Sequence, residues 1–213
     1  MPYLIALLVA LTTLTGCQST YYAAMEQVGV HKRDIMVDRV EDAKLSQQEA
    51  QQEFTSALDA LSALTQFDGG ELEAVYNQIN DKYEASEDAA QEVSDRIAAI
   101  EDVSAALFSE WEQELDLYTN ASLRRSSEQK LRETRTSYNT MIKAMQRAEQ
   151  RMTPVLNALR DNTLFLKHNL NASAIGSLQG EFGSLEKEIE QAIKQMNQAI
   201  TESDKFLNKL QAK

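Results

Sequence analysis

Apolar residues recur along most of the chain at alternating intervals of four and three, which is the spacing of helices that pack side by side. The clearest stretch lies between Glu71 and Tyr118, where one seam repeats every seven residues and a second seam runs between its members. The first seam comprises Leu72, Ile79, Ser86, Val93, Ile100 and Leu107, and the second comprises Tyr76, Tyr83, Ala90, Ile97, Ser104, Trp111 and Tyr118. This pattern predicts a long helix with one buried face.

Three further blocks repeat the same spacing in new registers. They begin near Ala43, Leu131 and Ile175. A few seam positions are polar, and we interpret these as residues that fix the register of packed helices at some expense in stability. They are Gln47, Ser86, Ser104, Thr134, Asn162 and Ser203.

Short polar breaks separate the four blocks. Their sequences are FDGGE (67–71), TNAS (119–122) and LNAS (170–173), which supply glycine or a helix-capping Asn or Ser. We therefore predict an all-α protein, an elongated antiparallel bundle or coiled coil of long helices. The third break has no Gly or Pro within it, so the last two segments could also form one bent helix and leave a fold of three helices. The predicted helices span residues 21–66, 70–119, 121–168 and 172–212.

The first sixteen residues form an uncharged, largely apolar run. At about 14 residues, YLIALLVALTTLTG is shorter than the roughly 20 residues that a helix needs to cross a bilayer. It fits the apolar core of a secretory signal, although no Lys or Arg precedes it. We interpret residues 1–16 as a cleaved signal and residues 17–213 as a single helical domain. The missing basic residue suggests a misplaced start codon, and the alternative to a signal is a short buried helix with an incidental cysteine.

Cys17 is the only cysteine of the chain, and it stands directly after this run. The sequence Leu14-Thr15-Gly16-Cys17 resembles the lipobox of bacterial lipoproteins. The resemblance implies cleavage before Cys17 and a stable anchor of several acyl chains, palmitate among them. Gln18 is not the aspartate that keeps lipoproteins in the inner membrane. The same resemblance therefore implies the outer membrane, with the protein facing the periplasm.

Charge is distributed unevenly between the predicted helices. The formal net charge of −12 disfavours nucleic acid as a partner and simple electrostatic docking on anionic lipid. Residues 70–119 include 14 acidic and 2 basic side chains, whereas residues 121–168 include 10 basic and 4 acidic ones. We predict that these two segments pair, with basic residues beside the acidic stretch SEWEQELD (109–116). The basic residues are Arg124, Arg125, Lys130, Arg132 and Arg135.

No pattern of catalytic or metal-binding residues stands out. The two histidines, His31 and His168, belong to no metal-binding motif, and no Gly-rich phosphate loop or GxSxG sequence occurs. A narrow bundle of tightly packed helices also leaves little room for a pocket. We therefore expect no enzymatic activity, no catalytic residues, no cofactor, no metal and no nucleic-acid partner.

The segment HKRDIMVDRVEDAKLSQQEAQQEF (31–54) is dense in charge and lies close to the predicted anchor. It is either a helix face with i,i+4 pairs or a docking face for an envelope protein. The residues predicted for docking are Lys32, Arg33, Asp34, Asp38 and Arg39. With LKHNLNASAI (166–175), and over the whole chain after the signal, this sequence resembles a family of uncharacterised helical lipoproteins of Gram-negative bacteria, domain of unknown function 2959. The resemblance implies no activity.

The leading hypothesis is a lipid-anchored periplasmic scaffold or protein-interaction lipoprotein, which binds the membrane through its N-terminal lipid and also binds an unknown envelope protein. The helical seams also permit a homo-oligomer. One alternative is a lipid-handling bundle that opens its amphipathic helices onto a membrane or an acyl chain, although the seams are narrow and the chain is acidic. Another is a cytoplasmic coiled-coil protein, if the first residues are not a signal.

Overall fold

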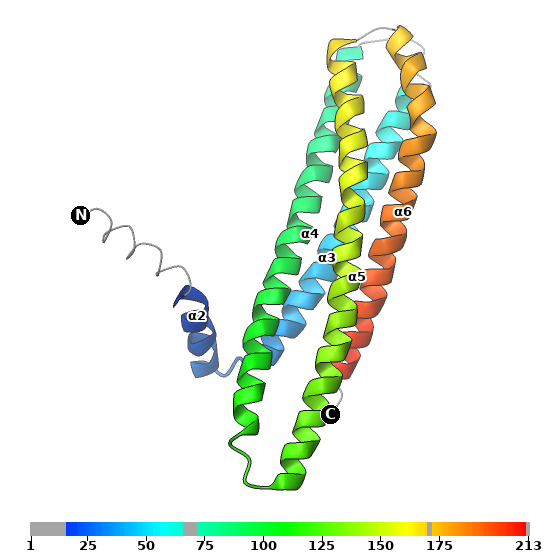
Figure 1. Ribbon diagram of the computed structural model, residues 1–213. Coiled ribbons are helices and arrows are strands. Elements are labelled where there is room, and N and C mark those ends of the chain that lie inside the picture. Colours follow the sequence, from blue (N-terminus) through cyan, green and yellow to red (C-terminus); the bar gives the residue numbers. More distant parts are fainter. Residues whose placement is uncertain (1–15, 66–71, 170–171, 212–213) are drawn as a thin grey trace, which may run out of the picture.

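The computed structural model describes residues 16–65, 72–169 and 172–211, which are almost entirely helical (Figure 1). A short helix, α2 (Gly16–Gln27), precedes four long ones. These are α3 (Lys32–Thr65), α4 (Leu72–Leu115), α5 (Ala121–His168) and α6 (Ala172–Gln211). The predicted all-α class is confirmed. The alternative with three helices is wrong, because α5 ends at His168 and α6 folds back against it.

The four long helices form an antiparallel bundle in which each helix packs against two neighbours (Figure 1). Helix α3 contacts α4 and α6, and α5 contacts the same two helices. With 34 residues in α3 and 48 in α5, the helices are about 50–70 Å long. Short connections make sequential helices antiparallel neighbours, as the sequence predicted.

The apolar seams fill the space between the four helices and form one core along the bundle. The last predicted member of the second seam, Tyr118, does not belong to this core. It lies beyond the end of α4 at Leu115 and is 42% exposed. Fully burying one large apolar side chain contributes about 1.5–3 kcal/mol. The largest side chains of the core that are less than 2% exposed include Met36, Phe54, Leu64, Ile100, Met141, Met145, Leu159, Ile189 and Phe206.

The polar seam residues bond mainly within their own helices. The hydroxyls of Ser86 and Ser203 donate to carbonyl oxygens four residues earlier, at 2.7 and 2.8 Å. The Ser104 hydroxyl donates to the carbonyl oxygen three residues earlier at 2.8 Å, and the Asn162 amide donates to the carbonyl oxygen four residues earlier at 2.7 Å. These four bonds lie within single helices and do not test the predicted role in register, which stays a prediction. Gln47 differs, because it is fully buried and neither side-chain polar atom has a hydrogen-bond partner in the described part of the chain.

The helix predicted over 21–66 is interrupted at Gly29. The N–H of Val30 donates to the carbonyl of Met25 at 3.0 Å, and that of Gly29 donates to the carbonyl of Glu26 at 3.0 Å. This Schellman motif ends a helix on a residue with positive φ, and Gly29 has φ +84°. Helix α2 is therefore an arm separate from the four long helices (Figure 1).

The connection between α4 and α5 ends on a cap that the sequence predicted. The Oδ1 atom of Asn120 accepts hydrogen bonds from the N–H groups of Ser122 at 2.9 Å and Leu123 at 3.2 Å. These bonds satisfy two donors that the first turn of a helix otherwise leaves unpaired. The cap fixes where α5 begins, and with it the shape of the α4–α5 hairpin.

Asn120→Ala should lower the free energy of unfolding by about 1 kcal/mol, because the two N–H groups lose their acceptor. Urea denaturation followed by circular dichroism measures this change. Asn139→Ala is the matched control, since Asn139 is exposed in the interior of α5 and should shift stability by no more than about 0.5 kcal/mol. Equal effects of the two substitutions would show that the cap contributes nothing specific.

Candidate functional site

The predicted lipid-attachment residue lies at the start of α2. The backbone of Cys17 and Gln18 is helical, but their side chains, like residues 1–15 of the predicted signal, lie outside the described part of the structure. Further along the arm, Tyr22 is 7% exposed and donates from its hydroxyl to Asp102 Oδ2 of α4 at 2.8 Å. Burial and this hydrogen bond raise the pKa of Tyr22 above the usual range of a tyrosine. The arm that follows Cys17 is therefore fastened to α4.

Lys32 joins α2, α3 and α4. Its ammonium lies 2.9 Å from Glu110 Oε1 of α4 and also contacts Glu26 of α2, and its side chain is 12% exposed. Burial opposes the charge on Lys32, but the two carboxylate partners outweigh it and raise its pKa, and the hydrogen bond from Lys32 lowers the pKa of Glu26. The contribution of Lys32 is lost as pH rises through its raised pKa, and that of Glu26 as pH falls through its lowered pKa. Both are present at neutral pH.

Two further residues predicted for docking also bond within the chain. The guanidinium of Arg33 donates to the carbonyl of Leu210, near the end of α6. A carboxylate oxygen of Asp34 accepts from the backbone N–H of His31 at 3.3 Å, at the start of α3. Arg33 thus links α3 to α6, and Asp34 satisfies a donor at a helix end.

The last two predicted docking residues lie one turn further along α3. Arg39 borders a surface hollow beside Tyr22 and Asp102, and Asp38 is exposed. The structure therefore brings all five residues to the first turns of α3, where Lys32, Arg33 and Asp34 engage other parts of the chain. Whether a partner binds this segment stays a prediction.

Lys32→Met should loosen α2 without unfolding the bundle. Methionine keeps the apolar stem but leaves Glu26 and Glu110 without the cation between them. We expect backbone amides of α2 to exchange with D2O roughly five times faster, as for a loss of about 1 kcal/mol, while those of the long helices keep their protection. Lys205→Met is the control, because Lys205 is 64% exposed and pairs with Glu202 of its own helix. Unchanged exchange in α2 would contradict the role given to Lys32.

At one end of the bundle, α4 and α5 extend past the start of α3 and the end of α6 (Figure 1). A second, small core holds these extensions together. It consists of Phe108, Leu115 and Leu131, with Trp111 and Tyr138 packed against it. The extension is therefore a two-helix hairpin with apolar contacts of its own.

Ion pairs join the two helices of this hairpin. Arg124 lies 3.0 Å from Asp116, and Arg135 lies 2.6 Å from Glu112. The predicted pairing of the acidic and basic segments is confirmed, although Arg132 pairs instead with Glu128 of its own helix at 2.7 Å. These side chains are 40–79% exposed, so solvent screens each pair, and the pairs act mainly on the orientation of the two helices.

The tip of the hairpin exposes large apolar side chains. Leu117 is 78% exposed, Tyr118 42% and Leu123 57%. They lie within seven residues of sequence, on the two sides of Asn120, the residue that caps the start of α5. Grouped apolar side chains at the surface are more informative than scattered ones, because they mark places where another molecule can bind.

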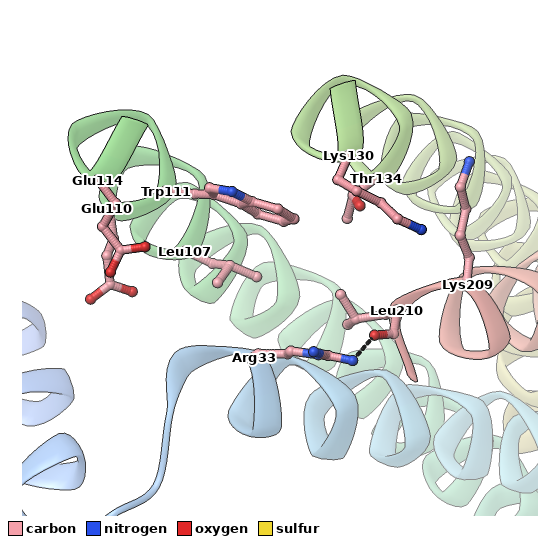
Figure 2. Close-up of a pocket in the computed structure, with 9 residues that line it drawn as sticks. All are labelled: Arg33, Leu107, Glu110, Trp111, Glu114, Lys130, Thr134, Lys209 and Leu210. Carbon is pink, nitrogen blue, oxygen red and sulfur yellow. Dashed lines mark hydrogen bonds between the residues drawn. The ribbon is translucent and has the colours of Figure 1, made fainter. Parts of the chain in front are cut away.

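A cavity of about 350 Å³ lies beside the hairpin, at the start of α3 and the end of α6 (Figure 2). The prediction that the bundle leaves little room for a pocket is wrong at this end, because two helices continue where the other two stop. The apolar lining of the cavity comes from Leu107, Trp111 and Leu210. Three basic side chains also border the cavity, those of Arg33, Lys130 and Lys209.

The described residues offer no metal centre. His31 precedes α3 and His168 is the last residue of α5, so the histidines stand at helix ends. Within the described ranges, no three His, Cys, Asp or Glu side chains gather closely enough to hold a metal ion. No helix in those ranges is long and apolar enough to cross a membrane.

The profile of a family described as "Protein of unknown function (DUF2959)" matches residues 21–210. The chain belongs to this family. The DUF2959 match covers the four long helices, except the last residue of α6, and most of α2. The family resemblance seen in the sequence is therefore confirmed, while its Gram-negative lipoprotein character stays a prediction. No curated protein and no solved structure matches the chain.

Besides the break at Gly29, sequence reasoning missed two features of this DUF2959 fold. Tyr22 gave no sign of its contact with Asp102, which lies 80 residues away. The cavity joins residues of four helices, and only Trp111, the single tryptophan of the chain, could have drawn attention to it.

Proposed function

We propose that the protein is a lipid-anchored, non-enzymatic interaction protein of the cell envelope, attached to the membrane through Cys17. The observation that carries this proposal is the position of the fold relative to that residue. Among the described residues, the core of the bundle is built almost entirely from α3 to α6, which all follow Cys17 in the sequence. Cleavage before Cys17 would therefore leave these four helices whole, and it would place the only cysteine at the new N-terminus.

Helix α2 suits the role of a connection between lipid and bundle. It is 12 residues long and is fastened to α4 through Tyr22 and, by way of Lys32, to Glu110. Lipid on Cys17 would thus lie a short arm away from the flank of the bundle. By the lipoprotein sorting rule, Gln18 directs the protein to the outer membrane, facing the periplasm.

The exposed tip of the α4–α5 hairpin supports a protein as the partner. Leu117, Tyr118 and Leu123 offer apolar contact area that the bundle itself does not use. The helix leading to the tip is acidic, with Glu114 in its last turn and Asp116 directly after it, which disfavours an anionic lipid surface as the occupant. We propose an envelope protein whose docking surface combines an apolar centre with basic residues around it.

Site-specific photocrosslinking in cells tests this role. Leu123 and Leu45 are both 57% exposed, so a photoreactive phenylalanine analogue at Leu123 has a matched control at Leu45. We expect a discrete heterologous adduct at Leu123, none at Leu45, and loss of the adduct with Cys17→Ala. No adduct at Leu123, or the same adducts at both positions, would refute the tip as the docking site. An adduct of twice the chain's mass would identify a second copy instead.

A further inference from the structure

The cavity at the end of the bundle has the size of a small-molecule site. Its volume of about 350 Å³ falls in the usual range for ligand pockets, and the proposed docking tip does not use it. Figure 2 shows its lining residues converging from α3, α4, α5 and α6. Because four separate segments meet here, the geometry of the cavity depends on the whole bundle.

Positive charge in this cavity is not neutralised within the described chain. No acidic side chain among the described residues pairs with Lys130, whose ammonium points into the space between the helices (Figure 2). Arg33 and Lys209 donate to backbone carbonyls, those of Leu210 and Glu133, and so retain their net charges. Arg33, Lys130 and Lys209 are exposed to solvent, and a group of like charges along one side of a hollow attracts an ion of opposite charge, here an anion.

The carboxylates near the cavity do not fill this need. Glu110 is engaged with Lys32 at 2.9 Å. Figure 2 shows Glu110 and Glu114 on the opposite side of Trp111 from Lys130. The acidic side chains of the lining are therefore separated from Lys130 (Figure 2).

A buried hydroxyl and an aromatic ring complete the lining. Thr134 is 5% exposed, borders the cavity, and has no hydrogen-bond partner among the described residues. Its hydroxyl oxygen is not among the fully enclosed atoms that lack a partner, so solvent or a ligand in the cavity can hydrogen-bond to it. The indole N–H of Trp111 already donates to Ser127 Oγ at 2.8 Å, which leaves its ring as apolar contact surface.

We propose that this cavity binds a small amphiphilic anion, a carboxylate or phosphate monoester that carries a short alkyl or aryl group. Lys130, Arg33 and the Thr134 hydroxyl hold the anionic head, and Trp111 and Leu107 contact the apolar part. This site is independent of the lipid on Cys17, so either proposal can fail without the other.

Intrinsic fluorescence tests the site directly, because Trp111 is the only tryptophan of the chain. The full chain carrying Cys17→Ala is titrated with octanoate and with octyl phosphate, below their micelle concentrations, and with octylamine as the cationic control. We expect a saturable change with at least one of the two anions and none with octylamine. No saturable change with either anion, or equal binding of octylamine, would overturn the proposal.

Two variants assign the binding to this cavity. Lys130→Gln should weaken binding of the anion by roughly 3- to 5-fold, as expected for the loss of an exposed, solvent-screened charge. Thr134→Val should weaken it less while preserving the shape of the side chain. Lys143→Gln is the control, since Lys143 is exposed on the same helix away from the cavity and should leave affinity unchanged. Unchanged affinity in Lys130→Gln, or equal loss in Lys143→Gln, would place the binding elsewhere.

Discussion

Phe206→Ala should lower the free energy of unfolding by about 3–5 kcal/mol, the largest loss expected from any single substitution considered for this chain. Phe206 is fully buried in α6, and its ring packs edge-on against that of Tyr138 of α5, with 6.3 Å between the ring centroids. Alanine would leave a cavity between two long helices that cannot collapse without bending both. Urea denaturation followed by circular dichroism and by Trp111 fluorescence measures the loss.

A matched substitution separates burial from residue chemistry. Phe165 is 38% exposed on α5, so Phe165→Ala removes the same atoms from a site that water already reaches. We expect a loss of no more than about 1 kcal/mol. If the two variants lose equal stability, the core position of Phe206 is wrong, and with it the packing of α6 against α5.

Gln47→Met should raise the free energy of unfolding by about 1–3 kcal/mol, which is unusual for a substitution in a core. Gln47 is fully buried in α3, and its amide oxygen and nitrogen have no partners in the described chain. Methionine has a similar length and no polar atoms that need hydrogen bonds, so it removes the desolvation penalty while keeping the volume.

The neighbouring glutamine provides the control for this gain. Gln48 is exposed, and Gln48→Met should change stability by no more than about 0.5 kcal/mol. A loss of stability in Gln47→Met would show that the Gln47 amide makes favourable bonds, to a water or to another helix. The polar residue would then specify the register after all, as the sequence analysis predicted.

The bundle was predictable because its determinants are local and repeated. Heptad spacing identifies the buried face of each long helix, and the capping chemistry of Asn120 identifies where α5 begins. The break at Gly29 was missed, because the residues around it lack a clear heptad register and one glycine is a weak signal inside a helical stretch.

The cavity could not be predicted from spacing. It depends on how far each helix continues, and the limits of helices are the least certain part of a sequence-based prediction. Arg33 and Trp111 are separated by 78 positions, and nothing in their local sequence indicates that they border one hollow. The charged residues at the start of α3 were interpreted either as a face with i,i+4 pairs or as a docking face, and the ion pairs of Lys32 with Glu26 and Glu110 were not predicted, because they depend on how α2 and α4 fold against α3.

The fate of Cys17 tests the central proposal most directly. The wild-type chain and Cys17→Ala are expressed in a Gram-negative host with labelled palmitate, and the intact mass of each is measured. We predict that the wild-type protein is labelled and has the mass of residues 17–213 plus diacylglyceryl and acyl groups, and that Cys17→Ala has neither. An unlabelled wild-type chain that retains residues 1–16 would contradict the lipid anchor and place the bundle outside the proposed compartment.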